Sequence, residues 1–247
     1  MSPADRETLS VDALSAGAMT PFHEPLLRSA VTHLRPALRQ RAILLDLGCG
    51  YGAVTAAMKM AAPRLVGLDL DPEAVAYARL RCPDVPYVVG DAHDIPFANN
   101  SVDALLSVST LQYTRWRPVL TECHRVLKPG GRGVFIENLR GNPLVACYRL
   151  LRRLAWLAPS FPGLGPMSRD PVPLRHINWN ERQAFAEVFG EAESTAHYLT
   201  TPLAVVGARM FRSLAGFDRT LLGARPELAQ RAWIMTVNVT KAPAAGT

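Results

Sequence analysis

Long apolar runs are absent from this sequence of 247 residues, and its N-terminus lacks a basic stretch followed by an apolar segment. A membrane-spanning helix needs about 20 consecutive apolar residues, and a secretory signal peptide needs both of those parts. We therefore expect a cytoplasmic protein without a transmembrane segment.

Cysteines in the short C-x-x-C spacing of metal and redox sites are also absent. The four that occur are scattered along the chain: Cys49, Cys82, Cys123 and Cys147. We expect free thiols that pack as small hydrophobic side chains. No His, Cys or Asp cluster has the spacing of metal ligands, so no metal is expected.

Lysine is scarce, because only Lys59, Lys128 and Lys241 occur among the 27 basic residues. Residues 1–138 carry 14 basic and 14 acidic side chains, whereas residues 139–247 carry 13 and 7, so the net charge of +6 comes from the second part. Arginine in place of lysine, with abundant Ala, Pro and Gly, is also typical of a GC-rich genome. The basic balance therefore says little in favour of a nucleic-acid partner.

From Ile43 onward, short apolar runs alternate with helical stretches, as in a mostly parallel sheet with helices on both faces. The pattern predicts strands at 43–47, 65–70, 87–89, 103–108, 133–136, 194–199 and 233–239. It predicts helices at 21–38, 51–62, 72–82, 115–127, 143–157, 179–189 and 203–222. We predict a Rossmann-like, doubly wound α/β sheet of about seven strands, mostly parallel with an antiparallel last strand.

A single domain is expected over residues 1–247. It would consist of an N-terminal helical lid (1–40), a cofactor-binding core (41–138), and a C-terminal half (139–247) with substrate-cap insertions at 158–180 and 203–224. The helix before the first strand would pack on the sheet edge or close over a ligand.

A glycine-rich turn follows the first predicted strand and opens a helix: Gly48, Gly50 and Gly52 alternate with Cys49 and Tyr51. Glycines allow a tight turn and close approach of a ligand, at which the first amides of the helix point. Asp69 ends the second strand, where a carboxylate can accept hydrogen bonds from two ribose hydroxyls. These features fit NAD and S-adenosyl-L-methionine equally well, but Ala53 breaks the dehydrogenase pattern G-x-G-x-x-G.

Four segments resemble, in order and spacing, the class I S-adenosylmethionine-dependent methyltransferases, and especially the methyltransferase type 11 group. They are LDLGCGYG (45–52), VGLDLDPE (66–73), GDAHDIPF (90–97) and RVLKPGG (125–131). The resemblance covers about residues 40–138. It implies S-adenosyl-L-methionine as the cofactor and methyl transfer as the activity.

The resemblance also implies roles for individual cofactor-binding residues. Asp46 would order the glycine turn, and the backbone of Gly48, Gly50 and Gly52 would lie along the cofactor. Asp69 would hold the ribose and Leu70 would flank the adenine. Asp91 would accept a hydrogen bond from the adenine amino group, Ala92 would offer its amide to the ring, and Ser107 would face the methionine part.

The acceptor side departs from the family. A histidine pair that members often carry after the fourth strand is replaced by Leu111-Gln112-Tyr113, which makes Tyr113 a candidate for orienting the acceptor. His23, Glu137 and His176 are further catalytic candidates, although a lone histidine is more often structural. A general base is needed only when the acceptor must lose a proton.

The predicted helix over 144–157 places arginines beside aromatic and aliphatic residues: Arg149, Arg152, Arg153 and Trp156. It is either an ordinary sheet-covering helix or a site of peripheral contact with an anionic lipid surface.

Three functions stay open at this point. The first is in-line methyl transfer to oxygen, nitrogen or carbon of a small-molecule acceptor: a secondary metabolite, a quinone-like or a lipid-like compound. The second is RNA methylation, in keeping with a pI of about 9.5, although no RNA-binding module or Asn-Pro-Pro-Tyr-like tetrapeptide is present. The third is a reaction without methyl transfer, such as a cyclisation. The protein is expected to be a monomer or a homodimer.

Overall fold

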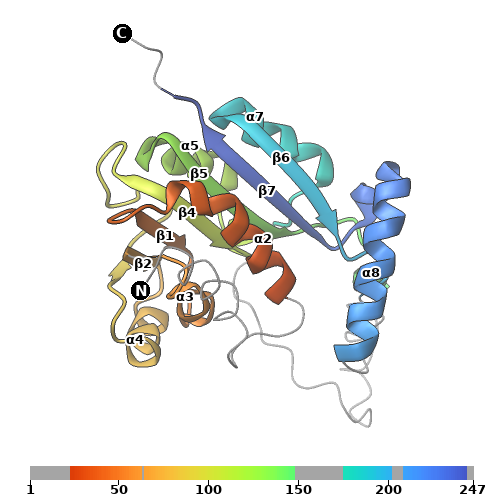
Figure 1. Cartoon of the computed structure of the whole chain (residues 1–247), viewed down its shortest axis with the longest axis horizontal. Helices are drawn as coiled ribbons and strands as arrows, with labels where there is room; N and C mark the ends of the chain where they lie inside the picture. The colour runs from red at the N-terminus through yellow and green to blue at the C-terminus, as the bar shows by residue number, and fades with distance from the viewer. Residues whose placement is uncertain (1–22, 63, 148–174, 202–207, 244–247) are drawn as a thin grey trace.

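A computed structural model describes residues 23–62, 64–147, 175–201 and 208–243 of the chain. One seven-stranded sheet in the order β3-β2-β1-β4-β5-β7-β6 forms its centre (Figure 1). The strands are β1 Ile43–Leu47, β2 Arg64–Asp69, β3 Tyr87–Val89, β4 Val102–Val108, β5 Leu127–Asn138, β6 Gly190–His197 and β7 Ile234–Lys241. β1 to β5 pair in parallel, and β7 runs antiparallel to both of its neighbours. The predicted fold class is confirmed.

Helices cover both faces of this sheet. They are α2 Glu24–Leu34, α3 Ala53–Met58, α4 Pro72–Arg81, α5 Trp116–Val126, α7 Gln183–Phe189 and α8 Ala208–Ala224. Short 3-10 turns lie at η2 Arg35–Ala37, η3 Leu111–Tyr113, η4 Trp179–Arg182 and η6 Pro226–Arg231. Residues 143–147 are helical. The predicted continuation of this helix, with Arg149, Arg152, Arg153 and Trp156, lies outside the described residues.

The helix before the first strand packs on a face of the sheet and not on its edge, which corrects one of the two predicted positions. Leu27 and Leu34 of α2 are buried in the same core as Leu44 and Val134. At its end, the His33 carbonyl accepts a hydrogen bond from Arg132 at 3.0 Å. Because Arg132 is the first residue of β5 after its bulge, the start of α2 points toward the carboxyl ends of the parallel strands. The predicted lid residues before 23 lie outside the described residues.

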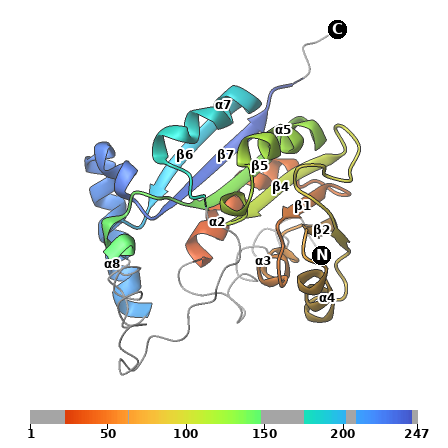
Figure 2. The same ribbon diagram turned by 180° about the vertical axis from the view of Figure 1, so that it is seen from behind.

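α5 and α7 cover the opposite face (Figures 1 and 2). Their contact is aromatic: the Trp116 and Phe185 rings stack with centroids 6.0 Å apart, and Phe135 of β5 meets Phe185 edge-on at 5.2 Å. Such pairs add to the free energy gained from burial of their area. Each face of the sheet is therefore closed by its own apolar core.

Several predicted boundaries differ from the structure, and three of them have a clear local reason. β5 begins at Leu127, because Lys128–Gly131 bulge out of the β4–β5 ladder instead of separating helix from strand. β6 begins at Gly190 and includes several polar residues, which an edge strand tolerates because it buries only part of its side chains. It ends before Tyr198, whose φ is 63°. α3 starts only after Gly52, which has a left-handed φ of 75°.

The cysteines are free thiols, as expected, but their burial differs. Cys49, Cys82 and Cys123 are buried, whereas Cys147 is exposed, so the prediction that all four pack inside is wrong for Cys147. Cys147 lies on the outer side of the short helix at 143–147, whose Val145 points inward. In the described parts of the chain, no helix is both long and apolar enough to span a bilayer.

Candidate functional site

The glycine turn after β1 is packed on both sides and open in the middle. Gly48, Gly50 and Gly52 all have left-handed φ values of 73°, 49° and 75°, which L residues with a side chain rarely adopt. A Cβ on Gly48 would clash with Thr110 Oγ1, and one on Gly52 would lie 2.9 Å from Ala78 Cβ. A Cβ on Gly50 would meet none of the described residues within 4 Å. The turn thus leaves space for a ligand against the Gly50 backbone.

Asp69 stands beside this space at the end of β2. Its Oδ2 accepts the Gly50 amide at 2.7 Å, and its Oδ1 accepts the Asp71 amide at 3.0 Å. Each carboxylate oxygen can accept a further hydrogen bond, so the group can bind two neighbouring hydroxyls without leaving the turn. The adjacent Leu70 side chain is 67% exposed and offers an apolar surface next to the carboxylate.

Asp46 lies beneath the turn and is buried. Its Oδ2 accepts the Thr55 hydroxyl at 2.5 Å, which ties β1 to α3. Burial, together with the nearby negative charge of Asp69, raises the pKa of Asp46 to about 6, although the hydrogen bond from Thr55 acts in the opposite direction. The group therefore supports the turn from inside, and its predicted interaction near the amino acid end of the cofactor stays a prediction.

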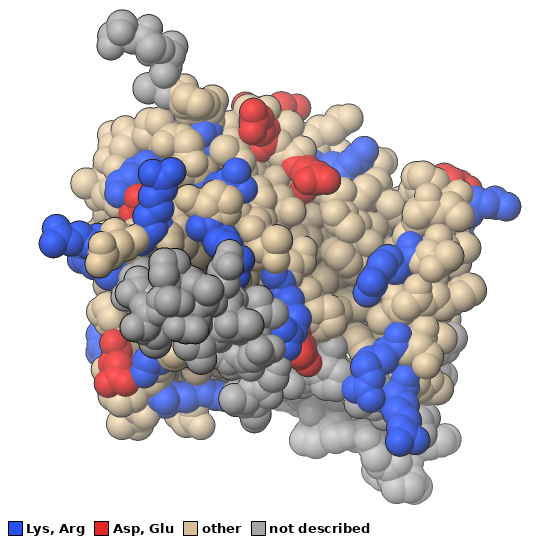
Figure 3. Space-filling view, viewed as in Figure 1, with Lys and Arg blue, Asp and Glu red and all other residues tan. Residues whose placement is uncertain are grey.

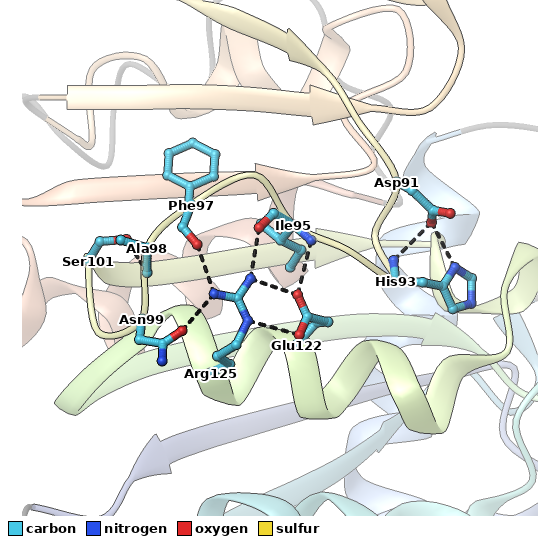
Figure 4. Close-up of polar contacts among 9 residues, drawn as sticks. All are labelled: Asp91, His93, Ile95, Phe97, Ala98, Asn99, Ser101, Glu122 and Arg125. Carbon is cyan, nitrogen blue, oxygen red and sulfur yellow. Dashed lines mark hydrogen bonds and ion pairs between the residues drawn. The ribbon is translucent and has the colours of Figure 1, made fainter.

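Asp91 and Ala92 follow β3, and the backbone joins them to Asp69, because the Gly90 amide donates to the Asp69 carbonyl at 2.9 Å. Asp91 Oδ1 accepts the His93 amide at 2.8 Å and lies 2.7 Å from His93 Nδ1 (Figure 4). Both contacts lower the pKa of Asp91, and the hydrogen bond from the His93 amide has the larger effect. Asp91 is therefore an anion and an acceptor at neutral pH.

Arg125 on α5 holds the loop at 95–99, which follows Asp91 and Ala92 in the sequence. Arg125 donates to the carbonyls of Phe97 and Ile95 at 2.9 and 2.8 Å and to Asn99 Oδ1 at 2.8 Å (Figure 4). Glu122 pairs with Arg125 at 2.7 Å and accepts the Ile95 amide at 3.0 Å. A guanidinium with five donors in a fixed plane suits this task. Sequence reasoning did not single out either residue, although Arg125 opens the segment RVLKPGG and Glu122 precedes it by three residues on the same helix.

The acceptor side of the site is built on the carboxyl ends of β4 and β5. Glu137 is buried, and its Oε1 accepts the amides of Thr110 and Leu111, both at 3.1 Å. Burial raises the pKa of Glu137 to about 8, although the amide hydrogen bonds act in the opposite direction. Among the described residues, neither Glu137 Oε2 nor Ser107 Oγ has a hydrogen-bond partner, and both atoms are buried. Two polar groups at this end of the sheet are thus available to a ligand or to water.

These bonds fix the turn η3, which carries Tyr113. Thr110 Oγ1 donates to the Leu47 carbonyl at 3.0 Å, and Asn138 Nδ2 donates to Gln112 Oε1 at 3.2 Å. The Tyr113 side chain is 47% exposed above this anchored turn. The structure therefore brings Tyr113, Glu137 and Ser107 to one end of the sheet.

The two histidine candidates lie around the same edge on separate segments. The Arg175 amide donates to the Gln112 carbonyl at 2.8 Å, which brings the segment of His176 against η3. His23 precedes α2, and burial lowers its pKa. Within the part of the chain that the structure describes, no group of His, Cys, Asp or Glu side chains is arranged to hold a metal ion.

A surface depression of about 530 Å³ lies elsewhere, between α5 and α7. Its lining includes Arg117, Thr121, Glu187, Val188 and His93. None of the glycines of the turn after β1 lines it. The depression is therefore not centred on the glycine turn.

Comparison with known proteins gives several relatives. A demethylmenaquinone methyltransferase of Thermotoga maritima is 40% identical over 102 residues, which are 40% of this chain and 44% of that protein. A fatty-acid O-methyltransferase of Mycolicibacterium smegmatis is 39% identical over 99 residues, which are 38% and 36%. An uncharacterised methyltransferase of Mycobacterium tuberculosis is 29% identical over 212 residues, which are 81% and 80%. The chain thus matches less than half the length of the first two relatives.

Residues 45–135 match the family model described as a methyltransferase domain. These residues therefore form a methyltransferase domain of the class I S-adenosylmethionine-dependent kind. A crystal structure of an S-adenosylmethionine-dependent methyltransferase from Mesorhizobium loti superposes on this methyltransferase with a TM-score of 0.58 at 22% identity. The match covers 92% of this chain and 100% of that one, so the two proteins share the whole fold.

Proposed function

We propose that the protein transfers a methyl group from S-adenosyl-L-methionine to a small apolar acceptor, quinone-like or lipid-like, by in-line displacement. The observation that carries the proposal is the open space over Gly50 beside the Asp69 carboxylate. The demethylmenaquinone and fatty-acid methyltransferases named among the relatives support an apolar acceptor, because both names describe apolar molecules.

The residues of the site fit the proposed cofactor. The backbone of the turn from Gly48 to Gly52 would lie along it, Asp69 would hold the ribose, and Leu70 would cover one side of the adenine. Asp91 and Ala92 would bind the adenine edge, and Ser107 would face the methionine part with its otherwise unpartnered hydroxyl. The bound cofactor supplies a methyl group on a sulfonium, which needs no further activation.

On the acceptor side, this chain would mainly position the acceptor. Glu137 is a positioning residue, because its Oε1 already binds the two amides that begin η3. Tyr113 would orient the acceptor from the turn that Glu137 holds. His176 and His23 would take part only with an acceptor that loses a proton during attack. Good alignment of two reactants can by itself account for much of a rate enhancement.

The proposed lid (1–40) and the caps (158–180 and 203–224) would exclude water above the cofactor. A dry pocket suits an apolar acceptor, since such pockets are lined mainly by apolar side chains with few polar groups. The contact of Phe211 on α8 with Tyr198, directly after β6, is in keeping with a position of α8 at the carboxyl end of that strand.

The test is incubation of the purified protein with methyl-labelled S-adenosyl-L-methionine and, in separate reactions, a lipid extract, a polar metabolite extract and total RNA of the source organism. Mass spectrometry should find the label in an apolar molecule from the lipid extract, and the variant Asp69→Ala should give none. Label in RNA alone would overturn the proposal in favour of an RNA methyltransferase. A product formed while the sulfonium is unchanged would favour a cyclase-like reaction.

A further inference from the structure

Helix α8 stands at the end of the sheet, beyond β6 and β7 (Figures 1 and 2). Its inner side is fixed to the body of the protein: Phe211 packs on the core of the α2 face and meets Tyr198 edge-on at 5.3 Å. Ile234 pairs with both Asn138 and His197. The carboxyl ends of β5 and β6 are therefore level, and α8 lies at the same edge of the sheet as the candidate active site.

The outer side of α8 carries arginines and no exposed acid of its own. Arg209, Arg212 and Arg219 are exposed, and the i, i+3, i+10 spacing places them along one side of the helix. The helix contains a single acid, Asp218, which is 1% exposed. Figure 3 shows Lys and Arg atoms along the visible side of α8.

Asp218 does not neutralise these arginines at the surface, because other groups of the protein hold it. Its two oxygens accept the amides of Thr200 and Thr201 at 2.9 Å and their hydroxyls at 2.7 and 2.6 Å. A carboxylate with four such donors is satisfied inside the protein. The helix is thus anchored through its acid and presents only positive charge outward.

The same helix exposes two large apolar side chains. Met210 is 38% exposed and Phe217 is 55% exposed, and their spacing of seven residues places them on one side over two turns. Burial of either would be favourable in an apolar environment. Around the helix, the exposed residues Ser213 and Thr220 lie between this apolar pair and the arginines.

We propose that the outer side of α8 binds an anionic lipid bilayer, with Arg209, Arg212 and Arg219 on lipid phosphates and with Met210 and Phe217 in the interface. Basic groups together with apolar side chains on one surface helix are what such binding requires. Nucleic acid would use the arginines but would leave Met210 and Phe217 in water. Docking would turn the candidate active site toward the bilayer, where an apolar acceptor dissolves; this purpose rests on the proposed function, whereas the binding itself does not.

The test is flotation of the full chain with vesicles of phosphatidylglycerol mixed with phosphatidylcholine, compared with phosphatidylcholine alone. We expect binding to the anionic vesicles only, weakened by salt. R209Q combined with R212Q should lower the partition coefficient about thirtyfold, at roughly 1 kcal/mol for each arginine near an anionic surface. F217S should lower it at least about fivefold, through the loss of buried apolar area.

Matched controls lie at the other end of the sheet. R64Q combined with R81Q removes the same charge from exposed positions on β2 and α4, and L80S removes an apolar side chain that is 83% exposed. Both should bind vesicles as the unmodified protein does. Circular dichroism melts of all variants should agree, because none of the substituted side chains is buried.

Several results would overturn the proposal: no flotation with any vesicle, equal binding to neutral vesicles, or equal losses in the α8 and control variants. It would also fail if the α8 variants changed the oligomeric state in size-exclusion chromatography, or weakened RNA binding and left vesicle binding intact. Flotation needs neither methyl donor nor acceptor. Its failure would therefore contradict lipid binding by α8, whereas failure of the methyl-labelling experiment would contradict the proposed function.

Discussion

Gly48 and Thr110 touch, and this contact joins the turn after β1 to the turn after β4. A Cβ on Gly48 would clash with Thr110 Oγ1. The same hydroxyl donates to the Leu47 carbonyl at 3.0 Å, and the Thr110 amide donates to Glu137. The proposed methyl-donor side and acceptor side of the site are therefore packed against each other. A substitution on one side should alter the geometry of the other.

Substitution of Gly48 by alanine should separate these turns. Gly130 is the matched control, because its φ of 74° equals that of Gly48 within a degree, while a Cβ on Gly130 would meet nothing within 4 Å. Gly130→Ala should cost about 1–2 kcal/mol of stability from backbone strain alone. Gly48→Ala should cost more and should weaken cofactor binding, as measured by urea unfolding and calorimetry. Equal effects of the two substitutions would refute the importance of the contact.

Removal of the Asp69 carboxylate should weaken cofactor binding about tenfold or more, since hydrogen bonds to a charged group contribute about 1.5–3 kcal/mol each. Isothermal titration calorimetry of Asp69→Ala with S-adenosyl-L-methionine measures this loss. The control is Asp84→Ala, which removes an exposed carboxylate paired with Lys59. Unchanged affinity in Asp69→Ala would contradict the assignment of the ribose site.

The raised pKa of Glu137 predicts how stability depends on pH. The folded protein keeps the proton up to a pKa of about 8, whereas the usual value is 4.5. The folded state then binds more protons than the unfolded state between these values, so this group lowers the free energy of unfolding as pH rises from about 4.5 to 8. The slope is at most about 1.4 kcal/mol per pH unit. Glu137→Gln, which cannot ionise, should have a flatter profile in urea unfolding across this range.

Glu137→Ala provides the contrast to that neutral variant. It leaves the amides of Thr110 and Leu111 without their acceptor, and a buried unsatisfied group costs about 1–3 kcal/mol. We expect Glu137→Ala to be less stable than the unmodified protein even at low pH, where Glu137→Gln should match it. If alanine and glutamine behave alike, Glu137 does not hold the turn η3.

The arginine clamp on α5 should control the order of residues 91–99. Arg125→Lys keeps the charge but cannot make the planar set of bonds to Ile95, Phe97 and Asn99. We expect faster hydrogen exchange in residues 91–99, because each lost hydrogen bond lowers the local stability of this loop by about 1 kcal/mol. We also expect several-fold weaker cofactor binding. Arg117→Lys is the control, since Arg117 is 59% exposed and lies 4.0 Å from Glu187. Unaltered exchange in Arg125→Lys would show that the clamp is not needed.

Sequence reasoning found the residues whose types are demanded by the local backbone. Gly48, Gly50 and Gly52 were identifiable because their φ values exclude other residues, and Asp71 caps α4 through the Glu73 amide at 2.9 Å. The same reasoning missed Arg125, whose partners lie on a loop far from it in sequence. It named Glu137 as a candidate for a direct catalytic role, which stays a prediction; that the Glu137 side chain accepts the amides of Thr110 and Leu111 was visible only in the structure.

The sequence by itself determined the fold class and the side of the site that resembles a methyl-donor site. The alternation of strands with helices, the glycine turns and the helix caps can be predicted from neighbouring residues, because each depends on backbone geometry over a few positions. Only the tertiary structure decided that α2 lies on a sheet face, that Cys147 is exposed, and that Gly48 touches Thr110. It also decided that Asp218 is buried, which leaves the arginines of α8 as the surface charge. These features depend on which distant segments pack together, and burial and partnership are properties of that packing.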